Sequence, residues 1–393
     1  MIVTNSDSFH IKDPLTIYMV DSHDSIIRGG AIQCVNLAIA LGKLGHNVQC
    51  FFKNPDDKQI DKEFERLNKY HIPIFFYNLK NPISLLKLRQ KILKDKPDIV
   101  HTHKNRALLA VFFSVWNKKQ FIWVANRGTV YPFKKQSLVY YIHKHYVDKI
   151  IAVSYAVKEA LVKDGIDESK IEVVYGSFDP DIFYPGISGL QMRAKWGIPE
   201  NAKVIGLVGS FASKKKGQDV FLHAAKLVLK SHSDTYFVFI GDGDDKKIRE
   251  LAKSLDIEKK VYFAGFYKDI QNAMAALDVL VCASLRGEGL TGAVREALAM
   301  EIPVVSTDVA GNRELVQDHK TGLLVPPGDS DALSKAIIYL IDNPDKAKLF
   351  AKNGRELVYK LCTNEQRAKT IEKIYKSMLL MHGSREYVNE TIP

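Results

Sequence analysis

The chain has 393 residues, of which 46% are hydrophobic and 26% charged, so it has an ordinary globular composition and is too long for one core. Its net charge of +11 is uneven, since residues 1–190 hold 26 Lys and Arg against 19 Asp and Glu. A basic half suits nucleic acid, an anionic membrane or a phosphorylated substrate. Nucleic acid is the partner we expect least, because the lysines are dispersed and the sequence has no nucleic-acid-binding motif.

Neither a membrane span nor a secretion signal is expected. The longest conspicuous apolar run, residues 108–116, falls short of the ~18 residues that cross a bilayer, and residues 1–14 are polar and mixed in charge. Four cysteines are scattered without the spacing of a metal or redox site (Cys34, Cys50, Cys282 and Cys362). We therefore expect a cytoplasmic protein in a reducing compartment.

The first half of the chain alternates apolar, strand-like runs with amphipathic segments. Strands separated by helices of this kind predict a parallel, doubly wound sheet. The expected strands are Leu15–Asp21, Val48–Phe52, Ile74–Tyr77, Asp98–His103, Phe121–Asn126 and Lys149–Ser154. The expected helices are Ala31–Leu44, Leu85–Lys94 and Leu108–Asn117.

The same pattern starts again after residues 184–190, a segment rich in Pro and Gly that is typical of a linker. Six further strands are expected at Lys203–Gly209, Tyr236–Gly241, Val261–Gly265, Val279–Ala283, Pro303–Thr307 and Leu323–Pro326. The chain therefore divides into residues 1–187 and 188–364, two Rossmann-like α/β domains that face each other across a cleft. A long amphipathic helix, Asn364–His382, follows.

The stretch from Arg286 to Leu298 links the strand ending at Ala283 to a helix and contains three glycines. Glycines let the backbone approach a ligand closely, and the helix start offers unpaired N–H groups and a positive dipole end, so an anion can bind there. On one continuous helix Glu288 and Glu296 would lie about 80° and roughly 12 Å apart, so they can share a ligand only if Glu288 lies on the loop. This arrangement predicts a nucleotide-sugar site. The alternative is a crossover with solvent-exposed glutamates.

Several segments of the chain resemble, in the right order, the retaining GT-B glycosyltransferases of family 4. They are Gly29–Ala31, Asp98–His103, Ile150–Ser154, Val174–Asp179, Val208–Phe211 with Lys216–Asp219, the pair Glu288 and Glu296, and Pro303–Thr307 with Gly311–Leu315. The order and spacing of these matches span nearly the whole chain. The resemblance implies the GT-B architecture, in which a last helix at about residues 365–382 packs back on the first domain.

The resemblance also implies how the donor is held. Glu288 would bond the hydroxyls of the donor sugar, Glu296 the ribose diol, and Lys216 would place its ammonium where charge grows as the glycosidic bond breaks. The diphosphate is expected on the backbone of Gly289, Leu290, Thr291 and Gly292. The other donor-binding residues are expected to be Gly29, Gly30, Gly265, Phe266 and Tyr267.

No metal ion or other cofactor is expected, because donor sites of this family generally work without a metal. The pair Asp242 and Asp244 looks like a structural turn of the family and not like a divalent-metal motif. Transfer is expected to retain the anomeric configuration, with a leaving phosphate oxygen accepting the proton of the acceptor. Glu288 would then position the sugar and would not act as a nucleophile.

The chain departs from the family pattern at three positions. Ser210 replaces an Arg that contacts the diphosphate, and Lys214 or Lys215 would compensate. Arg127 takes the place of a His near the sugar and would meet the donor phosphate or an anionic acceptor, unless it pairs with a surface carboxylate. Glu301 stands where a Gly usually ends the helix in the left-handed conformation, at a small cost in stability.

His101 and His103 lie two apart on one strand and so point to the same face. We place His103, at the carboxyl end of the strand, in the cleft as a catalytic group, together with Glu288, Lys216 and Arg127. His101 is expected to be a packed core histidine.

The basic, aromatic stretch of residues 134–149 has two interpretations. A helix there would contact the inner face of the cytoplasmic membrane close to a lipid-linked acceptor. Alternatively it is a crossover helix that packs Leu138, Tyr141, Ile142 and Tyr146 inward.

The leading function is a retaining transferase that moves a hexose-type sugar from a UDP- or GDP-sugar to a glycan or glycolipid hydroxyl. Such a reaction belongs to surface polysaccharide or lipopolysaccharide synthesis. One alternative is another chemistry on the same architecture, an epimerase or a phosphorylase. Another is a catalytically weak relative that binds nucleotide or glycan, which the loss of Arg at Ser210 keeps open.

Overall fold

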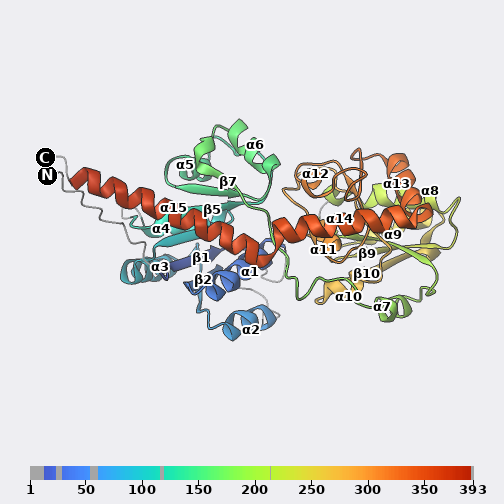
Figure 1. The fold of residues 1–393 in the computed structure, drawn as a ribbon, viewed down its shortest axis with the longest axis horizontal. Helices are drawn as coiled ribbons and strands as arrows, with labels where there is room; N and C mark the ends of the chain where they lie inside the picture. Colours follow the sequence, from blue (N-terminus) through green and yellow to red (C-terminus); the bar gives the residue numbers. More distant parts are fainter. Residues whose placement is uncertain (1–12, 24–28, 54–60, 116–118, 213, 391–393) are drawn as a thin grey trace, which may run out of the picture.

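The computed structural model describes residues 13–390 apart from 24–28, 54–60, 116–118 and 213. Two lobes lie side by side, one from each half of the chain, and the last two helices run along both of them (Figure 1). Each lobe contains one parallel sheet flanked by helices. The predicted architecture of two Rossmann-like α/β domains is confirmed.

The sheet of the first lobe has seven parallel strands in the order β3-β2-β1-β4-β5-β6-β7. These strands are β1 (Thr16–Asp21), β2 (Asn47–Lys53), β3 (Ile74–Tyr77), β4 (Ile99–His103), β5 (Ile122–Arg127), β6 (Lys149–Ala152) and β7 (Ile171–Val173). The sequence predicts the first six and misses β7, which has three residues and lies at the sheet edge. A run this short carries no readable period.

The sheet of the second lobe has six parallel strands in the order β10-β9-β8-β11-β12-β13, and all six were predicted. They are β8 (Lys203–Val208), β9 (Thr235–Ile240), β10 (Val261–Gly265), β11 (Val279–Cys282), β12 (Val304–Thr307) and β13 (Leu323–Val325). The strand order reverses between β1 and β4 in the first sheet and between β8 and β11 in the second. Ligands of open parallel sheets bind beyond the carboxyl ends of the strands at such points.

Fifteen α-helices connect or follow the strands within the described part of the chain. The first lobe has α1 (Gly29–Lys43), α2 (Asp61–Lys69), α3 (Pro82–Asp95), α4 (Asn105–Val115), α5 (Leu138–His145) and α6 (Tyr155–Lys163). The second has α7 (Leu190–Lys195), α8 (Gln218–Val228), α9 (Lys246–Ser254), α10 (Ile270–Met274), α11 (Gly292–Ala299), α12 (Asn312–Leu315), α13 (Ser330–Asp342) and α14 (Pro344–Cys362). The last helix is α15 (Asn364–Glu390).

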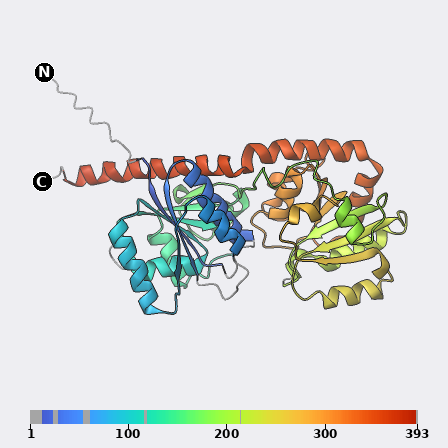
Figure 2. The same cartoon turned by 90° about the horizontal axis from the view of Figure 1, so that it is seen from below.

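Alternate residues of β1 point into two separate cores, one on each face of the first sheet. Ile17 and Met19 pack with α1 and α15, whereas Tyr18 and Val20 pack with residues of α3, α4 and α5. Helix α15 therefore covers one face of this sheet and α3–α5 the other, which is visible in the view from below (Figure 2).

Helix α15 carries the chain back to the first lobe and is anchored in its core. Ile371 and Tyr375 are fully buried there, and the Tyr375 hydroxyl lies 2.6 Å from Nδ1 of His101. Nη1 of Arg367 donates to the backbone carbonyl of Gln33 in α1 at 2.8 Å. These contacts tie a helix that continues from the second lobe to the strands and helices of the first.

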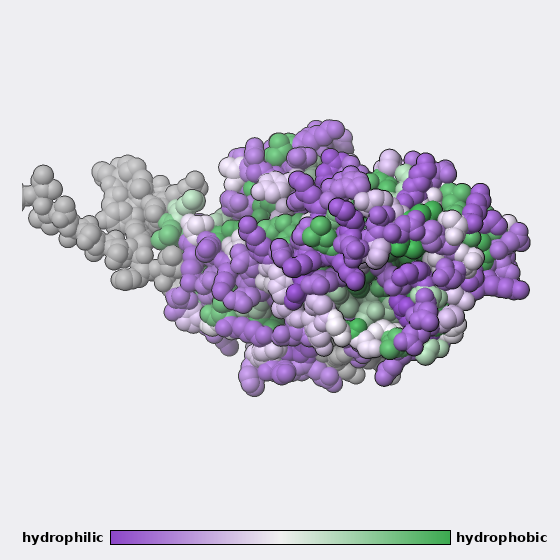
Figure 3. All heavy atoms as spheres, turned by 45° about the vertical axis from the view of Figure 1, so that its right-hand side comes forward, coloured by the Kyte–Doolittle hydropathy of each residue, from purple (hydrophilic) through white to green (hydrophobic). Residues whose placement is uncertain are grey.

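The surface is mostly hydrophilic on the face shown in Figure 3, where apolar side chains form small separate patches. Among the residues that the structure describes, no helix combines the length and apolar content needed to cross a bilayer. Just after α11, Glu301 has a φ of +56°, so the left-handed helix end expected from the sequence is present.

Candidate active site

The loop between β11 and α11 forms a corner at the carboxyl edge of the second sheet, and a loop of the first lobe touches it. Gly287 has a φ of +81°, and a Cβ built there would lie 2.1 Å from the hydroxyl oxygen of Tyr131. A Cβ on Gly289 would lie 2.4 Å from the carbonyl oxygen of Gly128. The close approach of the two lobes therefore requires glycine at both positions.

A buried hydrogen-bond network beneath the corner fixes the start of α11. Oγ1 of Thr291 donates to Oδ1 of Asn312 (2.8 Å), and Nδ2 of Asn312 donates to Oγ of Ser306 (3.1 Å). Oγ1 of Thr307 donates to the carbonyl oxygen of Ser284 (2.6 Å). Satisfied polar networks in a buried region hold their members rigidly, so the free N–H groups at the start of α11 are presented in one fixed arrangement for an anion.

Lys216 and Glu288 are direct partners at this corner. Nζ of Lys216 lies 2.8 Å from Oε1 of Glu288, and the Ser284 hydroxyl donates to the same carboxylate oxygen at 3.2 Å. Burial by itself would lower the pKa of Lys216, but the charge of Glu288 and the hydrogen bond to it more than offset burial, so the pKa is raised. The ammonium therefore remains charged at neutral pH although both side chains are partly buried.

Two glycines shape the backbone that carries Lys216, which ends the short 3-10 turn Lys214–Lys216. A Cβ on Gly209 would lie 3.3 Å from Cδ of the Lys216 side chain, which passes closely over this residue. Gly217 begins α8 with a φ of +64°, and a Cβ there would lie 2.0 Å from the carbonyl oxygen of Ala283. The lysine turn is thus packed backbone against backbone on the end of β11, where no side chain fits.

The two glutamates are arranged as the spacing argument required. Glu288 lies on the loop, and Glu296 is the fifth residue of α11. A Cβ on Gly292 would lie 3.5 Å from Oε1 of Glu296, so this carboxylate lies back toward the start of the helix. Burial raises the pKa of Glu296, and the charge of neighbouring Arg295 opposes that effect.

Ser210 stands at the position of the expected Arg, and Lys215 was expected to compensate for it; the two residues have different contacts in the structure. The Ser210 hydroxyl donates to the carbonyl of Asp242 (3.2 Å) and accepts from the N–H of Ala212 (3.2 Å), so it braces its own loop. Nζ of Lys215 lies 4.3 Å from the ring centroid of Tyr131 in the first lobe. The side chain of Lys214, the other expected substitute, lies outside the described part of the structure.

Three of the expected donor-binding residues lie at the end of β10 or directly after it, and they differ in their surroundings. Gly265 has a φ of +72°, and Phe266 is 47% exposed. The Tyr267 hydroxyl instead accepts a hydrogen bond from Nε1 of Trp196 at 3.2 Å, and the ammonium of Lys195 lies over the Tyr267 ring. Tyr267 is therefore committed to packing against α7, while Phe266 presents an exposed ring at the carboxyl end of the strand.

Arg127 is buried at the end of β5, so its expected alternative as a surface ion-pair residue is wrong. Its Nη2 donates to the carbonyl of Tyr131, and its guanidinium lies 4.3 Å from the ring centroid of Phe133. Burial lowers the pKa of Arg127, and the charge of Asp164 partly restores it. These contacts hold the loop that touches the corner, and a direct role toward donor or acceptor stays a prediction.

Gly29 and Gly30 open α1 next to the end of β1. Gly29 has a φ of +36°, and a Cβ on Gly30 would lie 2.3 Å from Nε2 of His23. Nδ1 of His23 lies 2.5 Å from Oδ1 of Asp21, the last residue of β1. In this structure Gly30 thus accommodates a histidine of the same lobe.

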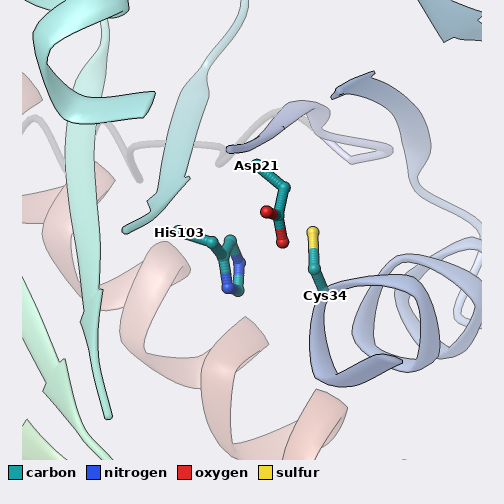
Figure 4. Close-up of side chains that lie close together, drawn as sticks. All are labelled: Asp21, Cys34 and His103. Carbon is teal, nitrogen blue, oxygen red and sulfur yellow. The ribbon is translucent and has the colours of Figure 1, made fainter. Parts of the chain in front are cut away.

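His103 lies in a buried polar cluster at the switch point of the first sheet. It pairs in register with Asp21, and Cys34 of α1 completes a group whose potential ligand atoms lie within 4.8 Å of one another (Figure 4). Burial and the charge of His101 lower the pKa of His103 well below its ordinary value, so the imidazole is neutral. The His103 side chain is 2% exposed, so it does not line an open cleft in this structure, and its catalytic role stays a prediction.

Asp21, Cys34 and His103 are the one set of three potential metal ligands found among the described residues. A carboxylate, a thiol and an imidazole are ligands that zinc accepts. However, burial raises the pKa of the Cys34 thiol well above its ordinary value, and the charge of Arg367 opposes this effect only in part. The thiol is therefore protonated, whereas zinc binds the thiolate.

A carboxylate of the second lobe caps a helix of the first. Oε2 of Glu314 accepts the N–H of Tyr155 at 2.9 Å, and Oε1 accepts the N–H of Ala156 at 3.0 Å. Beside it, a Cβ on Gly311 would lie 2.8 Å from Cβ of Ser154. Since the N-terminal N–H groups of a helix have no partner within it, this contact joins the lobes next to the candidate site.

Comparison with known proteins assigns both lobes. Residues 27–182 match the family described as Glycosyltransferase Family 4, and residues 190–357 match the family described as Glycosyl transferases group 1. The chain is a family 4 glycosyltransferase. Its corner, with Glu288, Lys216 and Glu296, lies in the second of these matched segments.

Relatives of this glycosyltransferase match along nearly the whole chain. The UDP-Gal:alpha-D-GlcNAc-diphosphoundecaprenol alpha-1,3-galactosyltransferase of Escherichia coli is 26% identical over 353 residues, covering 85% of this chain and 89% of that protein. A solved glycosyltransferase from Rickettsia africae is 25% identical, with a TM-score of 0.78 and coverage of 93% and 99%. HepE from Anabaena, solved in complex with UDP, has a TM-score of 0.81 at 20% identity, covers 92% and 100%, and supports the GT-B fold.

Sequence reasoning missed four residues of this region: Asp21, Ser284, Tyr131 and Glu314. Asp21 ends a predicted strand of the switch point, so its position alone could have identified it. The local sequence does not show the roles of the others, because each acts on a partner more than 150 residues away or on a loop whose conformation the sequence does not give.

Proposed function

We propose that this glycosyltransferase transfers a hexose-type sugar from a UDP- or GDP-sugar to a hydroxyl of a glycan or glycolipid, with retention of configuration and without a metal ion. The observation that carries the proposal is the ion pair of Lys216 and Glu288 on an N–H-rich corner. A cation and a hydrogen-bonding carboxylate lie there side by side, as a sugar diphosphate requires.

Each group of the corner has one task in this reaction. Lys216 and the N–H groups of Gly289 to Gly292 stabilise the negative charge that grows on the diphosphate as the bond from the sugar's anomeric carbon to the phosphate oxygen breaks. Glu288 orients the sugar hydroxyls, and Glu296 orients the ribose. The acceptor oxygen forms its bond to the anomeric carbon on the face the diphosphate leaves, and its proton passes to the leaving phosphate oxygen.

The names of relatives and structural neighbours support a choice of donor nucleotide. The Escherichia coli relative is named for UDP-Gal, and HepE was solved with UDP and with UDP-glucose. These names favour a UDP-sugar over a GDP-sugar, with the exposed ring of Phe266 as the group nearest to the base.

The names of relatives also support a choice of acceptor. Relatives include a transferase for a diphosphoundecaprenol-linked sugar, a phosphatidyl-myo-inositol mannosyltransferase and a lipopolysaccharide core glycosyltransferase. We therefore favour a glycolipid of surface-glycan synthesis as acceptor, which places the enzyme in the cytoplasm, peripheral to the inner face of the membrane.

The test begins with thermal-shift measurements on UDP-, GDP- and ADP-sugars, since a ligand that binds the folded state raises its stability with concentration. The sugar that binds is then supplied without acceptor, and slow nucleotide release is measured with and without a chelator. Nucleotide release that continues in the presence of the chelator supports transfer without a metal ion. A nucleotide-sugar that binds but releases no nucleotide favours the alternative of a catalytically weak relative. The presence of Ser210 in place of Arg supports the same alternative.

A further inference from the structure

Helix α3 presents a single exposed stripe in which apolar and basic residues alternate. Ile83, Leu86 and Leu93 are exposed, with Lys87 and Lys94 among them, at spacings of three and four residues that place them on one face. The opposite face of the helix buries Leu88 and Ile92 in the core. The exposed stripe is therefore separate from the face by which α3 packs on the sheet.

Helix α5 repeats this composition. Leu138 and Tyr141 are 40% and 49% exposed, and Lys144 lies on the same side. Of the residues that the crossover interpretation placed inward, Ile142 is buried and Tyr146 partly buried, whereas Leu138 and Tyr141 point outward. That interpretation is therefore correct for two of these four residues.

The two stripes belong to one face of the first lobe. Both α3 and α5 contact α4, which lies between them and adds the exposed ring of Phe113. The three helices cover the sheet face opposite α15 (Figure 2). We name the exposed residues Ile83, Leu86, Lys87, Leu93, Lys94, Phe113, Leu138, Tyr141 and Lys144 the α3–α5 face.

The charge around this face is predominantly positive. Residues 80–150 contain 15 Lys and Arg and 3 Asp and Glu, so the excess positive charge of the first half of the chain is concentrated there. Within α3, α4 and α5 the one carboxylate is Asp95, and it is already engaged by the Tyr18 hydroxyl (2.6 Å) and by Nζ of Lys91 (2.8 Å). An anionic partner would thus meet lysines with little competing negative charge.

The loop that leads into α5 connects this face to the candidate site. It starts after Arg127, places Gly128 and Tyr131 against the corner, and continues through Lys134 and Lys135, both exposed, to α5. A molecule carried on a surface against the α3–α5 face would therefore have its headgroup next to the place where the lobes meet.

We infer that the α3–α5 face docks on an anionic lipid bilayer. Lysines attract the headgroups, and short apolar side chains enter the boundary between headgroups and acyl chains, as in helices that lie in a membrane interface. An acidic protein would satisfy the lysines but leave apolar residues on two helices without the continuous planar partner that a bilayer supplies. This inference rests on the proposed function only through the location of the acceptor.

The test is co-sedimentation of the full chain with phosphatidylcholine vesicles that contain or lack phosphatidylglycerol. The unchanged protein should bind the anionic vesicles and lose most, but not all, of this binding in high salt. The double variant Lys87→Gln, Lys94→Gln should partition about 30-fold more weakly, because each lysine near an anionic leaflet contributes roughly a factor of five. The variant Leu86→Ser should weaken binding that remains in salt.

Matched controls lie on α14 of the second lobe. Lys346 and Lys348 are exposed, and Leu349 is 49% exposed against 55% for Leu86. The variants Lys346→Gln, Lys348→Gln and Leu349→Ser should leave vesicle binding unchanged. Equal binding by the α3 variants and the α14 controls, or no binding of the unchanged protein to anionic vesicles, overturns the inference.

Donor turnover measured on the same preparations separates this inference from the proposed function. Nucleotide release from a UDP-sugar in the absence of vesicles should be the same for all variants, because the substituted side chains are exposed and lie outside the corner. Loss of vesicle binding with normal release confirms the docking face. If the unchanged protein binds vesicles but releases no nucleotide, the inference about the docking face is supported and the proposed transfer is contradicted.

Discussion

Replacing Lys216 by Met removes the charge of this side chain while keeping nearly its length. The ammonium lies 2.8 Å from Glu288, where two unit charges attract by about 6 kcal/mol at an effective dielectric constant of 20. Much of this attraction is offset by the cost of desolvating the two charges. A bound diphosphate carries at least as much negative charge as the Glu288 carboxylate. Removing one fixed donor from a site where charge develops costs roughly 10²–10³ in kcat, about 3–4 kcal/mol. We expect Lys216→Met to fall in this range.

The assay is steady-state transfer or donor hydrolysis with kcat and KM determined separately. Because the charge on the diphosphate grows in the transition state, kcat should fall more than KM rises. Lys335→Met on α13, an exposed lysine of the same lobe, is the matched control. An unchanged kcat in Lys216→Met, with a normal melting curve, would refute the assignment of this cation to the leaving group.

Three further predictions follow from single contacts. Glu296→Gln should raise the free energy of unfolding near neutral pH, because burial raises this carboxyl's pKa and so penalises its ionised form; the gain should disappear as the pH falls below the ordinary carboxyl pKa. The same change should weaken donor binding about tenfold through a lost charged hydrogen bond. Gly217→Ala should cost about 2 kcal/mol or more in urea unfolding, since its φ is +64° and a Cβ would lie 2.0 Å from a carbonyl oxygen. Glu314→Ala should cost about 1 kcal/mol and speed amide exchange of Tyr155 and Ala156, because it removes their hydrogen bonds to the carboxylate while the Ser154 cap of α6 remains.

Each of these has an outcome that contradicts it. A stability difference between Glu296→Gln and the unchanged protein that does not vary with pH would mean that the carboxyl is not penalised by burial. Normal urea unfolding of Gly217→Ala would mean that the lysine turn can move away from β11. Unchanged amide exchange at the start of α6 in Glu314→Ala would mean that Glu314 does not hold these N–H groups in solution.

Much of this molecule is determined by short-range sequence chemistry. Apolar runs separated by amphipathic segments predict twelve of the thirteen strands, because a strand buried on both faces needs a continuous apolar run and its crossover needs a helix. The glycines of the corner, the place of Glu288 before α11 and the left-handed conformation of Glu301 also follow from residues close in the chain.

What the tertiary structure alone decides is which of these groups meet. The ion pair of Lys216 with Glu288 joins segments 72 residues apart, and the caps and clamps between the lobes join segments more than 150 residues apart. Strand periodicity gives the face and the end at which a side chain lies, but not the element packed against it. For that reason His103 and Arg127 were placed at the correct strand ends and yet proved buried. The outward side of α3 likewise became evident only once its inward side was seen packed in the core, since the sequence gives a helix two faces and packing selects which of them remains exposed.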